Sequence, residues 1–323
     1  MRVLIVGAGA VGGFLASVFH EAGHTVSVVA RGPHLHAIQK NGLRVITPDG
    51  RDSVAHLAAS DDPQALGAQD IIITTLKAPA LPGVLPMLGD VLTTKVPLIT
   101  AMNGVFWWYA DGMHQAPDTL RLDPDGQIAE QLSGKTSLGM VVHSTNEVIE
   151  PGVVQNRSPG NRFVVGGPSA ASVVGIREML SQLTLPNTVI EVVEDVRPVM
   201  WRKLLRNLTT APISVVTSAQ AFDVINDDQA RNVARALFLE GAAVAGAHGF
   251  SGLADEVVDV FSPGKGAKQK PSMSQDIDKG RPLEIDSILR VVQDFARQMD
   301  IPTPTLDTVL GLVILRARIA GCY

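Results

Sequence analysis

The apolar residues at the start of the chain form two short runs on either side of a helical stretch. Residues 2–6 (RVLIV) and 25–29 (TVSVV) are rich in β-branched side chains, which predicts two strands. Residues 13–21 have helical character, and Gly23 closes that stretch. The order strand, helix, strand predicts a βαβ unit, the building block of parallel sheets.

A glycine-rich turn joins the first strand to this helix. It has the G-x-G-x-x-G spacing of dinucleotide-binding folds, in Gly7, Ala8, Gly9, Ala10, Val11 and Gly12. Gly7 permits the tight turn, Gly9 lets a pyrophosphate approach the backbone, and Gly12 lets the helix pack closely on the strand. The helix N-terminus offers free N–H groups to the phosphates. We therefore predict dinucleotide binding, and a purely structural glycine turn is the alternative.

Arg31, two residues after the second strand, bears on the choice of cofactor. NAD-binding folds usually carry an acid there, which binds the ribose 2′-hydroxyl, but this chain has Arg31. A guanidinium offers a fork of N–H donors to a 2′-phosphate. The sequence therefore favours NADPH, or NADP(H) in general, over NADH. The alternative interpretation of Arg31 is a solvated surface charge.

Two later strands end at polar residues. The β-branched run 70–76 ends at Lys77, and the strand at 96–100 is followed by Asn103-Gly104. Ligands of open α/β sheets bind beyond the carboxyl ends of the strands, so Lys77 and Asn103 are expected at the cofactor site. A surface lysine and a simple Asn-Gly turn are the alternatives.

The remaining pattern divides the chain into a mixed half and a helical half. A hairpin is expected at 45–57 with its turn at 48–50, and residues 135–193 are strand-rich with a helix at 169–183. From Glu194-Asp195 onward the expected elements are helices at 199–211, ended or kinked by Pro212, and at 227–248, 284–299 and 306–319. We predict an α/β fold: a Rossmann-type domain with a mostly parallel sheet over 1–194, a helical domain over 195–323, and a cleft between them.

Composition excludes several other classes of protein. The 323 residues are 46% apolar and 18% charged, and the net charge of −5 without a long basic run argues against nucleic acid as a partner. Cys322 is the single cysteine and the eight histidines are scattered, so neither a disulfide nor a metal site is expected. Because no apolar run approaches the ~18 residues of a membrane helix and no leader pattern precedes the first strand, a cytoplasmic protein is expected, acting on a small molecule. The helical half is compatible with a homodimer.

Lys203 is the candidate proton donor. Reduction of a ketone builds negative charge on its oxygen, and an ammonium group can stabilise that charge and deliver a proton. Lys203 precedes Asn207 by four residues, so the two share one helix face. By helix chemistry alone, a solvated basic face is the simpler interpretation.

The aromatic cluster at 106–109 has three open interpretations, as a pocket wall, a hydrophobic plug or a contact between subunits.

The whole chain resembles the family of 2-dehydropantoate 2-reductase, also called ketopantoate reductase. The matching stretches are GAGAVGG with Arg31, TTLKA around Lys77, MNG at 102–104, WRKLLRN at 201–207 and SMSQDIDKGRPLEID at 272–286. The last two are specific in combination, whereas the first is shared with many dehydrogenases. The resemblance implies NADPH-dependent reduction of ketopantoate to (R)-pantoate, a step of pantothenate biosynthesis.

The resemblance also implies roles for individual residues. Lys203 would be the general acid, and Glu284 would bind and orient the substrate's oxygen. Ser272 would bind the substrate's carboxylate and Asn207 its hydroxyl, with Asn103 and Lys77 at the nicotinamide end. Each has a structural alternative: Ser272, for example, has the S-x-x-Q spacing of a helix capping box with Gln275.

Three departures from the family pattern concern the substrate. Ala211 stands where members commonly carry a second asparagine, and Leu289-Arg290 stands where Asn-Gly is frequent. The segment from Phe106 to about Gly134 is expected to enlarge the Rossmann-type domain. One alternative is therefore a reductase of a bulkier or more apolar 2-oxo acid. A protein that senses NADPH without catalysis is a separate alternative, which would need the cofactor residues but not Lys203 and Glu284.

Overall fold

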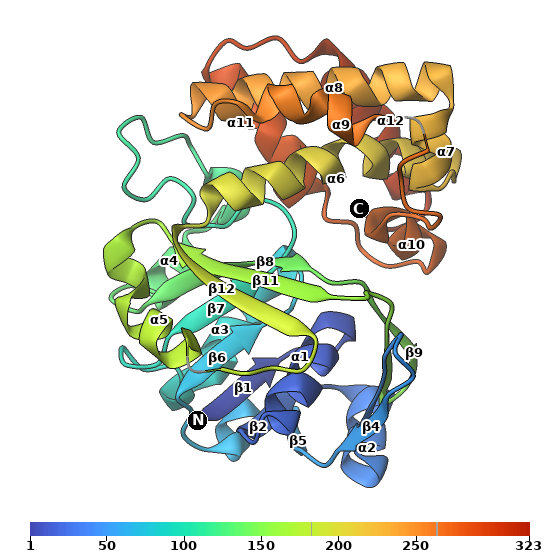
Figure 1. The fold of residues 1–323 in the computed structure, drawn as a ribbon. Helices are drawn as coiled ribbons and strands as arrows, with labels where there is room; N and C mark the ends of the chain where they lie inside the picture. The colour runs from blue at the N-terminus through green and yellow to red at the C-terminus, as the bar shows by residue number, and fades with distance from the viewer. Residues whose placement is uncertain (182, 263) are drawn as a thin grey trace. The chain divides into compact units, whose positions relative to one another are not determined.

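The computed structural model describes residues 1–181, 183–262 and 264–323, and these form two compact units (Figure 1). The sheet unit comprises residues 1–102 and 125–196, and the helical unit comprises 103–124 and 197–323. The expectation that the whole segment after Phe106 enlarges the Rossmann-type domain is therefore wrong for residues up to Pro124. The reason is local, because this segment buries its aromatic side chains among helices of the helical unit.

The main sheet of the sheet unit is built around the N-terminal strand. Its order is β12-β11-β8-β7-β6-β1-β2-β5, and its pairings are parallel except for that of β8 with β11. The strands are β1 (Arg2–Val6), β2 (Thr25–Val29), β5 (Ala58–Ser60), β6 (Ile71–Thr74), β7 (Leu98–Ala101), β8 (Ser137–His143), β11 (Asn161–Gly167) and β12 (Thr188–Asp195). The chain leaves β1 toward β2 and later returns to β6 on the other side, so the sheet's topological switch point lies beside β1. The glycine turn follows β1 directly.

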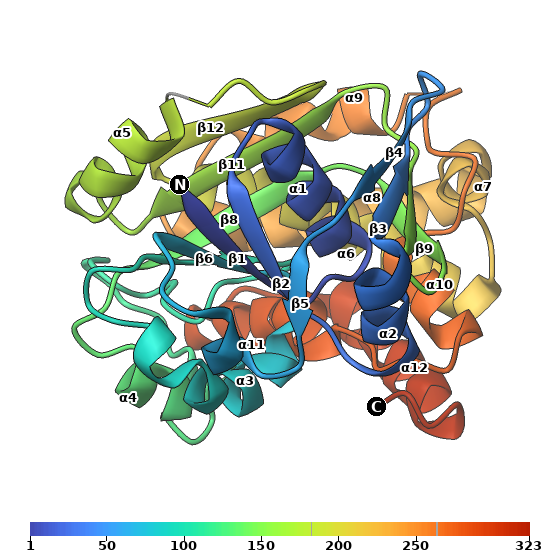
Figure 2. The same cartoon turned by 90° about the horizontal axis from the view of Figure 1, so that it is seen from below.

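A smaller sheet has the order β4-β3-β10-β9. Its strands are β3 (Leu43–Ile46), β4 (Asp52–Ala55), β9 (Asn146–Glu150) and β10 (Val153–Asn156), and β3 pairs with β4 as the hairpin predicted at 45–57. Helix α1 (Ala10–Glu21) contacts strands of both sheets (Figure 2). Its buried face includes Phe14, Leu15 and Phe19, which belong to the core of this unit. Burying α1 between two sheets fixes the glycine turn at its N-terminus.

The other helices of the sheet unit are short. They are α2 (Gly32–Asn41), α3 (Leu81–Leu88), α4 (Gln127–Gln131) and α5 (Val174–Ser181). The helix predicted at 169–183 consists of a 3-10 turn at Ala170–Val173 followed by α5, and Gln182 lies outside the described residues. The predicted α/β fold, with its mostly parallel sheet, is confirmed.

The helical unit is organised around α6 (Arg197–Thr217) and α8 (Asp228–Ala247). The remaining helices are α7 (Ala221–Asn226), α9 (Val257–Val260), α10 (Ser272–Asp278), α11 (Val291–Gln298) and α12 (Pro304–Ile319), with a π-helical turn at Asp286–Arg290. Gly241 of α8 faces α6 closely, since a Cβ there would lie 2.6 Å from Leu208. Pro212 does not end α6, which continues to Thr217 because packing outweighs the hydrogen bond that proline removes.

Side-chain carboxylates cap the N-termini of α8 and α12. Asp227 accepts hydrogen bonds from the N–H groups of Gln229 and Ala230 at the start of α8. Glu240 accepts from the N–H groups of Thr305 and Leu306, in the first turn of α12. Each carboxylate satisfies donors that have no partner inside the helix and complements the positive end of its dipole. In the described parts of the chain, no helix has both the length and the apolar character needed to span a membrane.

Candidate active site

A cavity of about 450 Å³ lies at the end of β1 in the sheet unit. Gly7, Ala8 and Gly9 of the glycine turn line it, together with Arg31 and His34 from the chain around the start of α2. The cavity therefore lies at the topological switch point, where open α/β sheets bind their ligands. The glycine turn and Arg31, which were both predicted to bind the cofactor, therefore line the same cavity.

The glycine turn has the geometry that a dinucleotide requires. Gly7 has a φ of +97°, which side chains rarely adopt. A Cβ on Gly12 would lie 2.1 Å from the Gly7 carbonyl oxygen, so only glycine allows this close contact of helix and turn. A Cβ on Gly9 would meet no described atom within 4 Å, which shows the open side of the turn.

The helix that follows the turn leaves its first donors available. Gly9 is the N-cap of α1, and none of the described side chains caps this helix. The first-turn N–H groups, which include those of Ala10 and Val11, have no acceptor within the helix. With the dipole of α1 they form a site for an anionic group. These residues fit the diphosphate of a nicotinamide dinucleotide.

Arg31 and Lys77 occupy two further positions in the sheet unit. Arg31 is exposed, and its Nη2 donates to the sulfur of Met87 at 3.4 Å. This weak contact leaves most of the guanidinium's donors facing solvent. Lys77 follows β6 and is the N-cap of the 3-10 turn Ala78–Ala80. The strand ends at Thr74, three residues before Lys77, and the described residues that line the cavity beside the glycine turn do not include Lys77. Its role at the cofactor site stays a prediction.

Lys203 and Glu284 form a charge pair in the helical unit. Lys203 lies in α6 and keeps some exposure, but its ammonium is largely withdrawn from water. This desolvation lowers the pKa of Lys203 from 10.5 to about 8, and the negative charge of Glu284 acts in the opposite direction. Glu284 is itself buried, with 8% of its surface exposed. A lysine with a pKa near 8 is a far better proton donor at neutral pH than an ordinary one.

Asn103 contacts the same carboxylate. Its Nδ2 donates to Oε2 of Glu284 at 3.4 Å, although the two residues are 181 positions apart. The backbone next to each of them explains this contact. The N–H of Val105 donates to the carbonyl oxygen of Ser287 at 2.9 Å, in the π-helical turn that follows Glu284. Such turns occur often at functional sites.

Gly104 makes this approach possible. Its φ is +87°, and a Cβ there would lie 2.2 Å from the carbonyl oxygen of Ser287. The Asn-Gly pair is therefore more than a simple turn, because the glycine allows the asparagine to reach the carboxylate. The sequence contained a signal for this, since Asn-Gly pairs mark positive φ values, but not the identity of the facing backbone.

The two remaining predicted residues lie on α6 and α10. Asn207 is half-buried, one turn after Lys203. Ser272 is exposed as the first residue of α10, and that helix is held on α6 by a hydrogen bond of 3.2 Å from Ser274 Oγ to the carbonyl of Ser214. Ala211, buried to 5% exposure, follows on α6.

The alternative interpretation of Ser272 as part of a capping box is wrong. Pro271 is the N-cap residue of α10, and no described side chain caps this helix. The Gln275 side chain instead donates to the carbonyl of Lys270 at 2.8 Å. The helix starts one residue earlier than the motif requires, because proline favours the extended conformation of an N-cap. The hydroxyl of Ser272 therefore has no capping role.

The aromatic cluster at 106–109 is mainly an internal plug. Phe106 stacks on Trp108 at 5.2 Å, and both are buried. The hydroxyl of Tyr109 accepts from Trp201 Nε1 at 2.8 Å and lies 2.8 Å from Nδ1 of His248. Burial lowers the pKa of His248 to about 4, so this histidine is neutral at physiological pH. Through Trp201 the cluster ties the segment of Asn103 to the helix of Lys203.

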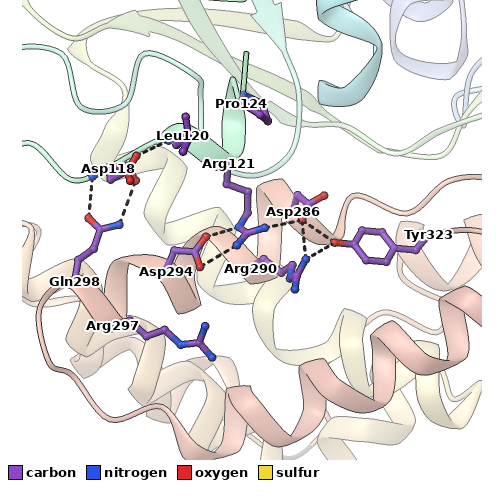
Figure 3. Close-up of a pocket in the computed structure, with 10 residues that line it drawn as sticks. All are labelled: Asp118, Leu120, Arg121, Pro124, Asp286, Arg290, Asp294, Arg297, Gln298 and Tyr323. Carbon is purple, nitrogen blue, oxygen red and sulfur yellow. Dashed lines mark hydrogen bonds and ion pairs between the residues drawn. The ribbon is translucent and has the colours of Figure 1, made fainter. Parts of the chain in front are cut away.

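A second cavity, of about 590 Å³, lies in the helical unit, and its charged lining residues bind one another (Figure 3). Arg121 binds Asp294 with two nitrogens and lies 3.5 Å from Asp286. Tyr323 donates to Asp286 at 2.9 Å and accepts from Arg290 at 2.9 Å. These aspartates and arginines neutralise one another. Of the described residues that line this cavity, none is a predicted site residue.

The described residues offer no group of three or more His, Cys, Asp and Glu side chains that could hold a metal ion.

A Rossmann-type unit with a dinucleotide turn and a desolvated lysine beside a carboxylate define the class of NAD(P)-dependent oxidoreductases. Sequence comparison then gives the family. The profile described as ketopantoate reductase PanE/ApbA matches residues 3–166, and that of its C-terminal domain matches 195–317. The chain belongs to the ketopantoate reductase family, as its sequence resemblance predicted.

Individual relatives agree with this assignment. The 2-dehydropantoate 2-reductase of Mesorhizobium japonicum is 38% identical over the full length of both chains. A Ralstonia solanacearum structure assigned to ketopantoate reductase is 34% identical, with a TM-score of 0.86 over 100% of this chain and 99% of that one. A D-mandelate dehydrogenase with NADH and anilino(oxo)acetate is 18% identical with a TM-score of 0.85 over the full length of both, which shows a shared fold.

Substitution of Gly104 tests the contact that places Asn103. In Gly104→Ala, the new Cβ meets the Ser287 carbonyl at 2.2 Å and φ is +87°, so we expect a loss of stability well above the roughly 1–3 kcal/mol of a strained backbone alone. Gly112→Ala is the matched control, because Gly112 has a φ of +71° but no described atom within 4 Å of its Cβ. Urea unfolding measures the free energy of unfolding of both variants. Equal losses of stability would show that the contact with Ser287 is unimportant.

Proposed function

We propose that this protein catalyses the NADPH-dependent reduction of 2-dehydropantoate (ketopantoate) to (R)-pantoate, a step of pantothenate biosynthesis. The observation that carries the proposal is the pairing of Lys203 with Glu284, a carboxylate that Asn103 also contacts, in a chain of this family. The full-length similarity to an enzyme named 2-dehydropantoate 2-reductase supports the choice of substrate.

The proposed chemistry adds a hydride and a proton across a carbonyl group. The glycine turn and Arg31 would hold a reduced nicotinamide dinucleotide, which would supply the hydride for the carbonyl carbon. The carbonyl oxygen of the substrate is then the atom on which negative charge develops. Lys203 Nζ donates its proton to that oxygen. Its pKa of about 8 leaves it mostly protonated at pH 7 and still acidic enough to donate.

Glu284 and Asn103 support the proton donor in this proposal. The carboxylate of Glu284 favours the charged form of Lys203. We propose that it also binds and orients the substrate's oxygen. Asn103 donates to one oxygen of Glu284 and so restrains its orientation. Asn207 and Ser272 are the proposed partners of the substrate's hydroxyl and carboxylate, and Lys77 the proposed residue near the nicotinamide.

The choice of NADPH rests on Arg31. It lines the cavity beside the glycine turn, and its guanidinium is exposed apart from the contact with Met87. A planar guanidinium binds a phosphate through two parallel hydrogen bonds. No acidic side chain among the described residues that line this cavity is available to bind a ribose 2′-hydroxyl.

A bulkier or more apolar 2-oxo acid is the second candidate substrate. Ala211 is buried and carries no hydrogen-bonding group at a position where the family commonly has an amide. A site with an apolar methyl in place of an amide favours a less polar ligand. The D-mandelate dehydrogenase of the same fold was solved with anilino(oxo)acetate, an aromatic 2-oxo acid derivative.

Assembly and cellular location complete the proposal. The Staphylococcus aureus ketopantoate reductase, 20% identical and with a TM-score of 0.74, is described as dimeric. We propose a homodimer that acts on a small-molecule substrate in the cytoplasm.

A substrate panel tests the function directly. We expect NADPH oxidation with ketopantoate at a kcat/KM of about 10⁴ M⁻¹s⁻¹ or above, and Lys203→Ala should lower kcat by about 10²–10⁴-fold while NADPH still binds. Arg202→Ala is the control, because this neighbour is exposed and pairs with Glu256. A stronger rate with a larger 2-oxo acid would favour the second substrate, and NADPH binding without any turnover would indicate a sensor.

The pH dependence tests the role of Glu284. Reduction requires protonated Lys203, so kcat/KM should fall as the pH rises through about 8. In Glu284→Gln the charge that favours the ammonium is gone, so the pKa of Lys203 falls and this alkaline limb moves to lower pH. Glu256→Gln, which removes the partner of Arg202 on the exposed side of α6, should leave the limb in place. An unmoved limb in Glu284→Gln contradicts the pairing.

Arg31→Ala tests the cofactor preference. Because Arg31 is proposed to bind the 2′-phosphate, its removal should raise the Kd of NADPH by about tenfold or more and change that of NADH by much less. Fluorescence titration with each cofactor measures this. Arg44→Ala, which removes an exposed arginine of β3 that pairs with Asp52, serves as the charge control. Equal effects of Arg31→Ala on both cofactors would exclude contact with the 2′-phosphate.

A further inference from the structure

His34 connects two backbone segments on the wall of the cofactor cavity. It lies in the first turn of α2 and is half-buried. Its Nε2 lies 2.6 Å from the carbonyl oxygen of Ala8 in the glycine turn. The N–H of Gly152, in the turn between β9 and β10, donates to its Nδ1 at 3.0 Å.

These two contacts determine which nitrogen of His34 carries the proton. A backbone N–H can only donate, so Nδ1 accepts from Gly152 and is unprotonated. In a neutral imidazole the proton is then on Nε2, which donates to the carbonyl of Ala8. The ring therefore uses both nitrogens to hold backbone groups, and neither is left for general acid–base chemistry.

The direction of the Ala8 carbonyl controls that of the next amide. In a trans peptide the C=O of Ala8 and the N–H of Gly9 point in opposite directions. A carbonyl held toward His34 therefore aims the Gly9 N–H away from the histidine. Gly9 is the N-cap of α1, on the open side of the turn where a Cβ would meet no described atom.

We infer that His34 is a positioning residue of the cofactor site, whose Nε2–H anchors the Ala8 carbonyl and so presets the Gly9 N–H for the diphosphate of a nicotinamide dinucleotide. The inference rests on the proposed function, because it assumes such a cofactor in this cavity. It adds a residue that neither the glycine spacing nor Arg31 indicates. A preset donor spares the cofactor the cost of ordering the turn when it binds.

Two amide variants separate the contacts of His34. The side chain in His34→Gln places Nε2 near the position of the histidine Nε2 and keeps the donor to Ala8. The shorter side chain in His34→Asn places Oδ1 near Nδ1 and keeps the acceptor for Gly152. Each variant loses one hydrogen bond, so their melting temperatures should be similar. His36→Asn, at an exposed position of the same helix, is the control.

Titration with NADPH, followed by steady-state kinetics, gives the decisive comparison. We expect His34→Asn to raise the Kd and the KM of NADPH by about fivefold or more, with kcat at saturating NADPH little changed, and His34→Gln to stay within about twofold of wild type. Equal losses in both variants, or a larger loss in His34→Gln, would overturn the inference. If His34→Asn does not fold, the test rests on His34→Gln alone. A rise of more than about twofold in the Kd of NADPH for that variant would still overturn the inference. A wild type that binds neither NADPH nor NADH would instead refute the proposed function.

Discussion

The reaction proposed for this protein depends on the balance between desolvation and charge at Lys203. Removal of its ammonium from water lowers the pKa to about 8, and the carboxylate of Glu284 limits that fall. Without burial, the lysine would be a poor acid at neutral pH, and without the carboxylate more of it would lose its proton. Neither residue has the required property alone. The helical unit therefore has to hold a lysine of α6 against an acid that follows it by 81 positions.

Several contacts of the segment 103–124 maintain this arrangement. The hydroxyl of Tyr109 joins Trp201 and the neutral His248, and Arg197 donates to the backbone carbonyls of Tyr109 and Asp111 at 3.1 and 3.0 Å. Two of these partners, Trp201 and Arg197, lie on the helix that carries Lys203. A segment that follows a strand of the sheet unit in sequence is thus fixed to α6 by buried polar groups, which are costly to leave unpaired.

The glycine turn illustrates a different use of close contact. Gly12 allows α1 to reach the backbone of Gly7, and Gly9 leaves the open side of the turn accessible. At Gly12 the absence of a side chain permits a contact that no other residue allows, because a Cβ there would lie 2.1 Å from the Gly7 carbonyl oxygen. Gly104 applies the same principle in the helical unit, where it lets Asn103 reach Glu284 by packing against the carbonyl of Ser287. Glycine at these positions serves geometry, at the cost of conformational entropy in the unfolded chain.

The sequence by itself determined the local features of this protein. The period of apolar residues predicted the parallel sheet, the hairpin of β3 and β4 and most helices, and the spacing of Gly7, Gly9 and Gly12 predicted the dinucleotide turn. These features depend on neighbours in the chain, so a pattern of residues suffices to indicate them. A family resemblance, and not helix chemistry, singled out Lys203 and Glu284.

Only the tertiary structure decided the features that join distant parts of the chain. It assigned the segment 103–124 to the helical unit, continued α6 past Pro212, and removed the capping role of Ser272. It also showed how far burial lowers the pKa of Lys203 and which backbone groups His34 holds. Packing and desolvation depend on groups that are remote in sequence, and no local pattern of residues contains that information.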